Sequence, residues 1–294
     1  MRFLFIVLLI SQLLLSCERE ITFQLDQPAS KLVVEAFIEN GEPPMVFLTS
    51  SIGYYASVNL PILNESLVKD AEVSIEHAGS RYVLKGYAAL GPTSLLGYYY
   101  TVDSVAQQPI LKGVLRGSYA LKIRWKGESY QAITNIPDTT RSIDSIFWKS
   151  PPPGNPPGKV AVYVRAKDRP GFGDYIRYFT KQNNGPFLPG LNSVFDDQII
   201  DGTSYEVQID RGVLRTGELE EGYSLFNKGD TVQLKLCTID KATFDFWRTT
   251  EFNFASVGNP FSSPTRVLSN LSNGALGYFG GYAVQYRRLL IPRQ

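Results

Sequence analysis

Few residues in this chain have the types and spacing that catalysis needs. His77 is the one histidine in the sequence, so any Ser-His-Asp relay would depend on it. The surrounding "IEHAGS" contains no nucleophile motif and is typical of the end of a hairpin. We therefore interpret His77 as a turn residue. Because zinc sites need several His or Cys ligands, the sequence excludes them.

Acidic residues offer the next candidate chemistry. The segment "FDDQIIDGTSY" brings Asp196, Asp197 and Asp201 close together in the chain, and calcium prefers carboxylate oxygens as ligands. The one-three-five spacing of a calcium loop is missing, and an Asp-Gly pair is also typical of a turn. A turn is the preferred interpretation, with calcium binding as the alternative. We predict no catalytic residue, no metal and no cofactor, and therefore no enzyme.

Aromatic residues form a third group of candidates. Tyr54-Tyr55 and Tyr98-Tyr99-Tyr100 could bind sugars or partners, but consecutive strand residues point to opposite faces, which favours cross-strand packing. The segment "NPFSSPTRVLSNLSNGALGYFGGY" contains Pro and Gly at positions that impose an irregular path, and long composed loops are often functional. Closing a sandwich is the alternative role. The candidate interaction residues are Asn259, Pro260, Phe261, Pro264, Tyr278 and Phe279.

The elements that must position these residues are strands. Segments such as "KLVVEAFIE", "SYALKIRW" and "KVAVYVRAK" alternate β-branched or aromatic residues with polar ones between turn residues. This pattern predicts an all-β chain of two antiparallel β-sandwich domains. One short helix is predicted in the second domain, over "KATFDFWRTTEFNFA" with Asp240 as its N-cap.

Two proline-containing segments compete for the domain boundary. The run "PPPGNPPG" at 151–158 has linker composition, but the segments "IDSIFWKS" and "KVAVYVRAK" on either side of it look like paired strands. We therefore place the boundary at "NIPDTTRS" and interpret the prolines as a long hairpin loop. The predicted organisation is a signal peptide at 1–16, a tether at 17–28, an N-terminal β-sandwich at 29–138 and a C-terminal β domain at 139–294.

The N-terminus predicts where the protein resides. Arg2 and the mostly apolar "FLFIVLLISQLLLS" fit a secretory signal, and this run is too short for a transmembrane helix, which needs about 20 apolar residues. "LLSC" at 14–17 resembles the lipobox of bacterial lipoprotein precursors, although Leu15 departs from the usual small residue. The resemblance implies lipidation of Cys17 and a membrane anchor. An ordinary signal peptide is the alternative.

Charge and cysteine content argue against a nucleic-acid-binding protein and against a disulfide-stabilised one. The net charge of +1 gives no electrostatic reason to expect nucleic acid as a partner. The two cysteines are Cys17 and Cys237, so a chain lipidated at Cys17 forms no internal disulfide. Cys237 alternates with apolar residues in "VQLKLCTID", which predicts a buried structural thiol.

The sequence resembles a known family over nearly all of the chain after Cys17. The blocks that carry the resemblance include "LVVEAFIENGEPPMVFLTSSIGYY", "KGDTVQLKLCTIDKATFDFW" and the most specific, "NPFSSPTRVLSNLSNGALGYFGGYAV". The family consists of lipoproteins of Bacteroidota classed as a domain of unknown function, and its members are commonly encoded beside TonB-dependent outer-membrane receptors. The resemblance implies an N-terminal immunoglobulin-like or prealbumin-like sandwich, a second β domain and outer-membrane attachment, and supplies no catalytic residues.

Four short motifs resemble the O-glycosylation sequon that Bacteroidota use on exported proteins. They are "DSV", "DTT", "DSI" and "DTV", and short motifs of this kind often occur by chance. The candidate modified residues are Ser104, Thr139, Ser145 and Thr231.

Together these observations predict a non-enzymatic, lipid-anchored outer-membrane protein that assists a TonB-dependent receptor. The receptor partner rests on the family resemblance alone. A structural or adhesive surface protein is one alternative, and an unrecognised hydrolase is another. The acidic residues of "ERE" after Cys17 resemble the export signal that sends Bacteroidota lipoproteins to the cell surface, although Arg19 interrupts them. This resemblance favours the cell surface over the periplasmic face. The sequence identifies no small-molecule or glycan ligand.

Overall fold

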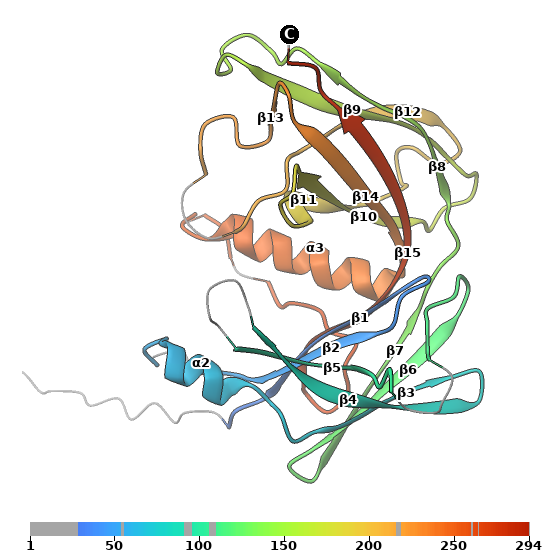
Figure 1. Cartoon of the computed structure of the whole chain (residues 1–294), viewed down its shortest axis with the longest axis vertical. Helices are drawn as coiled ribbons and strands as arrows, with labels where there is room; N and C mark the ends of the chain where they lie inside the picture. The colour runs from blue at the N-terminus through green and yellow to red at the C-terminus, as the bar shows by residue number, and fades with distance from the viewer. Residues whose placement is uncertain are drawn as a thin grey trace, which may run out of the picture.

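The computed structural model describes most of the chain after residue 28. The first half consists mainly of strands that follow the predicted alternation of apolar and polar residues. Figure 1 shows them in the lower part of the molecule. The described residues are 29–53, 56–90, 96–105, 110–215, 219–259, 261–263 and 265–293. The elements of the first half are β1 (Leu32–Glu39), β2 (Met45–Ser50), α2 (Leu60–Ser66), β3 (Glu72–His77), β4 (Ser80–Leu90), β5 (Leu96–Val102), β6 (Ser118–Trp125) and β7 (Glu128–Asn135).

The second half adds more strands and a longer helix, which Figure 1 shows in the upper part. Its β8 and β9 pair antiparallel across the proline-rich segment, which confirms the predicted hairpin. Its elements are β8 (Arg141–Lys149), β9 (Lys159–Asp168), β10 (Tyr175–Gln182), β11 (Leu188–Asp196), β12 (Ser204–Ile209), β13 (Phe226–Asn227), β14 (Thr231–Ile239), α3 (Lys241–Ser256) and β15 (Leu276–Leu290).

The all-β, sandwich-like architecture is confirmed, but two details of the prediction are wrong. An 11-stranded sheet runs through both halves in the order β11-β10-β14-β15-β1-β2-β5-β4-β3-β6-β7. The strands of the first half join those of the second half where β1 pairs with β15 in parallel. The sheet is therefore mixed and not purely antiparallel. The described residues also contain a second helix, α2, in the first half. Asn59 caps α2 by accepting a hydrogen bond from the Ile62 N–H at 3.0 Å.

The first half encloses its own core because the large sheet folds over on itself. A side-chain carbon added at Gly281 of β15 would lie 2.3 Å from the Asn135 carbonyl oxygen, so the end of β7 lies directly on β15. Alternate residues of β1, among them Val34, Ala36 and Ile38, are buried inside this fold. Period-two patterning thus places one face of each strand in the core.

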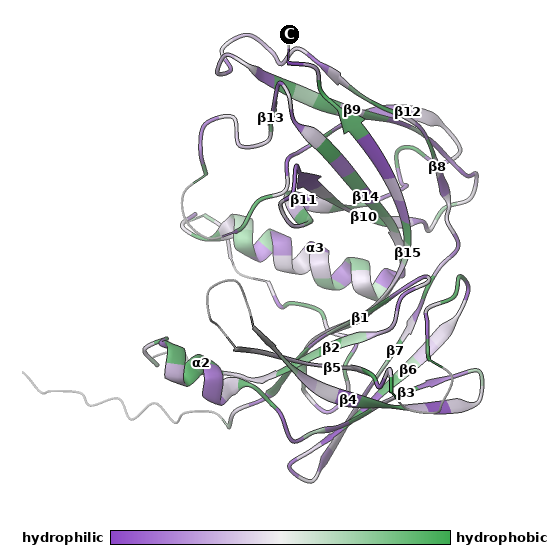
Figure 2. Ribbon diagram, viewed as in Figure 1, coloured by the Kyte–Doolittle hydropathy of each residue, from purple (hydrophilic) through white to green (hydrophobic). Residues whose placement is uncertain are grey.

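The second half is a sandwich with a helix on one side. A 4-stranded sheet contains β12, β9 and β13, with β8 also paired to β9. Val162 and Val164 of this sheet pack against Leu234 of β14 in the core between the two sheets. Figure 2 shows hydrophobic and hydrophilic residues alternating along β9 and β14.

Helix α3 covers the opposite face of the large sheet. Phe244 of α3 is buried in a cluster with Cys237, Tyr278 and Tyr282. The helix begins where predicted, because the Asp240 carboxylate accepts a hydrogen bond from the Thr243 N–H at 2.8 Å. The helix predicted from the sequence is therefore confirmed.

Strand β15 contributes to every core. Phe279 lies in the core of the first half, Tyr282 lies under α3, and Leu289 packs against the core of the second half. The boundary predicted between 138 and 139 falls in the segment that connects β7 to β8, and it remains a prediction. The structure adds that the last strand of the chain belongs to both halves.

Candidate functional site

The structure places His77 where the sequence predicts it. His77 is the last residue of β3 and pairs with Ser80 across the turn to β4. Its ring stacks on Tyr119 at 4.4 Å between ring centroids, and its Nδ1 lies 2.9 Å from the Ser118 carbonyl oxygen. Among the described residues no carboxylate hydrogen-bonds to this imidazole, so the geometry does not form a Ser-His-Asp relay.

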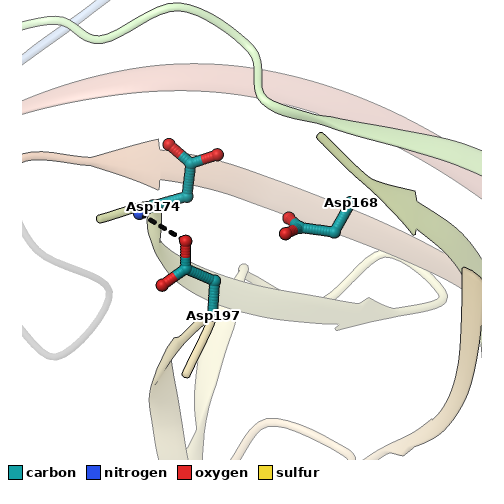
Figure 3. Close-up of side chains that lie close together, drawn as sticks. All are labelled: Asp168, Asp174 and Asp197. Carbon is teal, nitrogen blue, oxygen red and sulfur yellow. Dashed lines mark hydrogen bonds between the residues drawn. The ribbon is translucent and has the colours of Figure 1, made fainter. Parts of the chain in front are cut away.

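The three aspartates of the predicted calcium segment do not come together. Asp196 is the last residue of β11, and Asp201 accepts a hydrogen bond from the Gly171 N–H at 2.6 Å. Asp197 instead meets two aspartates from other strand ends, Asp168 and Asp174 (Figure 3). One oxygen of each of these three carboxylates lies within 4.8 Å of the others. We call Asp168, Asp174 and Asp197 the acidic cluster.

Strand ends position the acidic cluster. Asp168 ends β9, Asp174 immediately precedes β10 and Asp197 immediately follows β11. The Asp197 Oδ2 atom accepts the N–H groups of Gly173 and Asp174, both at 2.9 Å, and Figure 3 shows the second of these hydrogen bonds. The sequence carries no signal for this grouping, because the three aspartates lie at the ends of different strands and only the fold shows which strand ends meet.

Two arginines offset part of the charge of the acidic cluster. Arg141, the first residue of β8, lies with its Nε 2.9 Å from the Asp168 Oδ1, and both side chains are fully buried. Arg169 lies 3.9 Å from Asp174. Burial raises the pKa of the Asp174 carboxyl. The three carboxylates are the residues that could hold a cation, but this arrangement fits a junction that ties strand ends together better than a calcium site.

A second candidate site is an exposed apolar surface around the C-terminal end of α3. Figure 2 shows hydrophobic residues at this end of the helix. The most exposed side chain is Phe261, at 96%. We call this group the α3-end surface, and it consists of Phe252, Phe254, Val257, Phe261, Val267 and Leu268.

Specific hydrogen bonds hold part of the segment that follows α3 against the helix at this surface. The Asn253 side chain donates to the Thr265 carbonyl oxygen at 2.6 Å and accepts from the Thr265 N–H at 2.7 Å. The Thr249 hydroxyl accepts from the Leu268 N–H at 3.1 Å. Thr265 and Leu268 are therefore held beside α3.

The end of α3 is also fixed to β11. The buried Glu251 carboxylate accepts hydrogen bonds from the Ser193 N–H at 2.8 Å and from the Ser193 hydroxyl at 2.6 Å. It also forms an ion pair with Arg215 at 2.6 Å. Charge-assisted hydrogen bonds of this kind are strong, so the α3-end surface rests on a rigid support.

Some of the predicted interaction residues are exposed in the structure and others are buried. Asn259 and Phe261 are exposed. Tyr278 and Phe279 are buried in β15, so the prediction of a continuous loop through them is wrong. They belong to a strand because "GYFGGYAV" pairs with β1. Pro260 and Pro264 lie outside the described residues.

The other aromatic candidates pack as the alternation predicts. Tyr98 and Tyr100 lie on one face of β5 with ring centroids 5.4 Å apart, while Tyr99 packs on Tyr87 from the neighbouring strand at 5.9 Å. Cross-strand packing is therefore confirmed for Tyr99, and Tyr98 and Tyr100 lie on the opposite face of the strand as the alternation predicts. Tyr54 and Tyr55 lie outside the described residues.

The four candidate glycosylation residues have different surroundings. Ser104 and Thr139 are exposed outside the strands, whereas Ser145 in β8 and Thr231 in β14 are half-buried. Asp230, which precedes Thr231, accepts hydrogen bonds from Gln182 at 2.6 Å and Asn183 at 2.9 Å. That motif therefore has a structural role in a turn. Modification of all four remains a prediction.

Cys237 is a free, buried cysteine. Burial raises the pKa of the Cys237 thiol to about 12, which agrees with a buried structural thiol. Cys17 lies outside the described residues. Within the described parts of the chain, no helix is long and apolar enough to cross a membrane.

Comparison with known proteins gives one family match. The family described as "Domain of unknown function (DUF4249)" matches residues 18–288. No curated protein matches the chain. The family match bears out the resemblance only as far as a domain of unknown function, and it assigns no ligand and no reaction.

Proposed function

We propose a function from the premise that the chain belongs to the DUF4249 family. It is a non-enzymatic protein, anchored to the outer membrane by lipid on Cys17, that docks on a TonB-dependent receptor through the α3-end surface. The receptor as partner comes from the family resemblance in the sequence. The observation that favours docking is the exposed α3-end surface itself.

Two physical properties make the α3-end surface suited to a protein partner. Its aromatic and aliphatic side chains are exposed to solvent, while hydrogen bonds of Asn253 and Thr249 and the ion pair of Glu251 fix neighbouring parts of the chain. Contiguous exposed apolar residues mark interaction sites in many soluble proteins, and aromatic anchors contribute most of the binding energy at protein interfaces. Because the support is rigid, little conformational entropy is lost on docking.

The tether agrees with a partner in the membrane. A chain spans at most about 3.5 Å per residue, so the predicted segment 17–28 reaches roughly 40 Å. A protein anchored at Cys17 is therefore held within a domain diameter or two of the membrane. Such restriction raises the effective concentration of a membrane-embedded partner.

Replacing Cys17 with alanine tests the anchor. We expect the Cys17→Ala protein to move from the membrane fraction to the soluble fraction, because the lipid provides the attachment. The measurement is fractionation of cells after ultracentrifugation, followed by immunoblotting. Cys237→Ala is the matched control and should stay with the membrane, since Cys237 is buried in the fold. Tight membrane association of Cys17→Ala would refute the anchor.

Replacing two aromatic residues tests docking. We expect Phe252→Ser with Phe261→Ser to reduce the amount of receptor barrel that co-purifies from mildly solubilised outer membranes by more than tenfold, because each buried aromatic side chain contributes about 1.5–3 kcal/mol. The control is Val83→Ser with Ile133→Ser, whose parent side chains are also exposed but lie on β4 and β7. Co-purification of a barrel with the wild-type protein and with the Phe variant alike would exclude this surface. The absence of a barrel from the wild-type preparation would count against the receptor.

A further inference from the structure

The two sheets of the second half leave a cavity where their edges meet. β11 is the end strand of the large sheet and β12 is an end strand of the small sheet. These strands follow each other in the chain but do not pair. A cavity of about 520 Å³ lies between them, within the range of about 300–1,000 Å³ that is typical of small-molecule sites. We call it the edge pocket.

Apolar side chains form most of the edge pocket. Its floor includes the core residues Leu234 and Leu236 of β14, and one wall is Tyr178 stacked on Phe195 at 5.9 Å between ring centroids. Phe195 and Val207, on the two edge strands, are each 41% exposed although they are large hydrophobic residues. Covering them with an apolar molecule would gain hydrophobic free energy.

The charges around the edge pocket largely offset one another. Glu206 is paired with both Lys149 and Arg165. Arg248 and Asp196 also line the pocket, and within the described residues neither forms an ion pair. Arg248 lies over the Phe244 ring, 5.7 Å from its centroid. The named groups are three positive and two negative side chains, an excess of one positive charge. Lys149 and Arg165 are about half exposed, so solvent screens this excess and the pocket has little electrostatic preference for a charged ligand.

We propose that the edge pocket binds the hydrocarbon chain of a single-chain amphiphile, whose head group stays at the mouth. The chain fills the space over Leu234 and Leu236 and covers Phe195 and Val207. Affinity comes from the buried methylene groups and not from the charge of the head. This site is separate from the α3-end surface, so the proposal does not depend on the receptor.

The test measures affinity against chain length. Alkyl carboxylates and alkyl maltosides of six to ten carbons are titrated, below their micelle concentrations, into the full chain with Cys17→Ala, followed by calorimetry. We expect each added methylene to tighten binding about fourfold, the equivalent of ~0.8 kcal/mol, with a negative heat-capacity change and similar affinities for the two head groups. An affinity that does not depend on chain length, or no binding of either series, overturns the proposal.

Two variants locate the site. Val207→Trp fills the edge pocket and should weaken binding of the ten-carbon compounds at least tenfold, whereas Val83→Trp, at an exposed position on β4 outside the pocket, should not. Arg248→Gln should change affinity less than threefold, because the head is not recognised by charge. Unchanged binding by Val207→Trp overturns the location, and a tenfold loss by Arg248→Gln overturns recognition of the chain. A urea midpoint like that of the parent establishes that each variant is folded.

Discussion

Replacing Arg141 with methionine should lower the free energy of unfolding by about 3–5 kcal/mol, the usual cost of breaking a buried ion pair by removing one partner. Arg141 and Asp168 are both fully buried and lie 2.9 Å apart. Without the guanidinium, the buried Asp168 carboxyl loses the cation that faces it and lies next to Asp174 and Asp197. Urea denaturation of the Cys17→Ala protein, followed by tryptophan fluorescence, provides the measurement.

Two further variants separate the buried charge from the loss of packing. Arg165→Met removes an arginine from an exposed ion pair with Glu206 and should leave the urea midpoint nearly unchanged. The double variant Arg141→Met with Asp168→Leu should recover at least half of the loss, because no unpaired charge remains in that pair. A double variant as unstable as Arg141→Met alone would show that the cost is not electrostatic.

Replacing Gly277 with alanine should have a similarly large effect, lowering the free energy of unfolding by roughly 3–5 kcal/mol. Gly277 has a φ of +98° and lies opposite Val34 where β15 meets β1. A side-chain carbon there would lie 1.8 Å from the Val34 carbonyl oxygen. Left-handed strain and overpacking each cost about 1–3 kcal/mol. The same urea experiment measures the loss.

Gly274 provides the control for backbone strain alone. It also has a positive φ, +68°, but no atom lies within 4 Å of the position that a side-chain carbon would take. Gly274→Ala should therefore cost about 1–2 kcal/mol. Equal losses for the two variants would contradict the role of close contact between β1 and β15.

The sequence predicts the local elements well because their signals are local. Alternation along β1 and β9, and the cap at Asp240, depend on residues a few positions apart. The parallel pairing of Val33 with Leu276 has no such signal, since the two strands belong to opposite ends of the chain. Helix α2 carries little signal because it has only 7 residues, too few to show helical periodicity. The Asn59 cap and the proline in its first turn are typical of a helix start.

The candidate sites also differ in whether a local sequence signal predicts them. Phe261 was predicted from the irregular composition of its segment, and it is exposed. The same reasoning misplaced Tyr278 and Phe279, because the glycines around them suggested a loop when close packing against β1 and β7 requires glycine there. The acidic cluster and the edge pocket depend on which strand ends meet, and this is a property of topology.

The place of β15 also has a consequence for the order of folding. β1 is among the first strands synthesised, yet one of its edges pairs with β15 from the end of the chain. Until β15 arrives, that edge offers unpaired N–H and C=O groups to any other extended polypeptide. Contacts of such long sequence separation form slowly, so the unfinished protein has a prolonged phase in which aggregation competes with completion of the sheet. Chaperones that shield an open β edge would therefore matter most for the newly made N-terminal half.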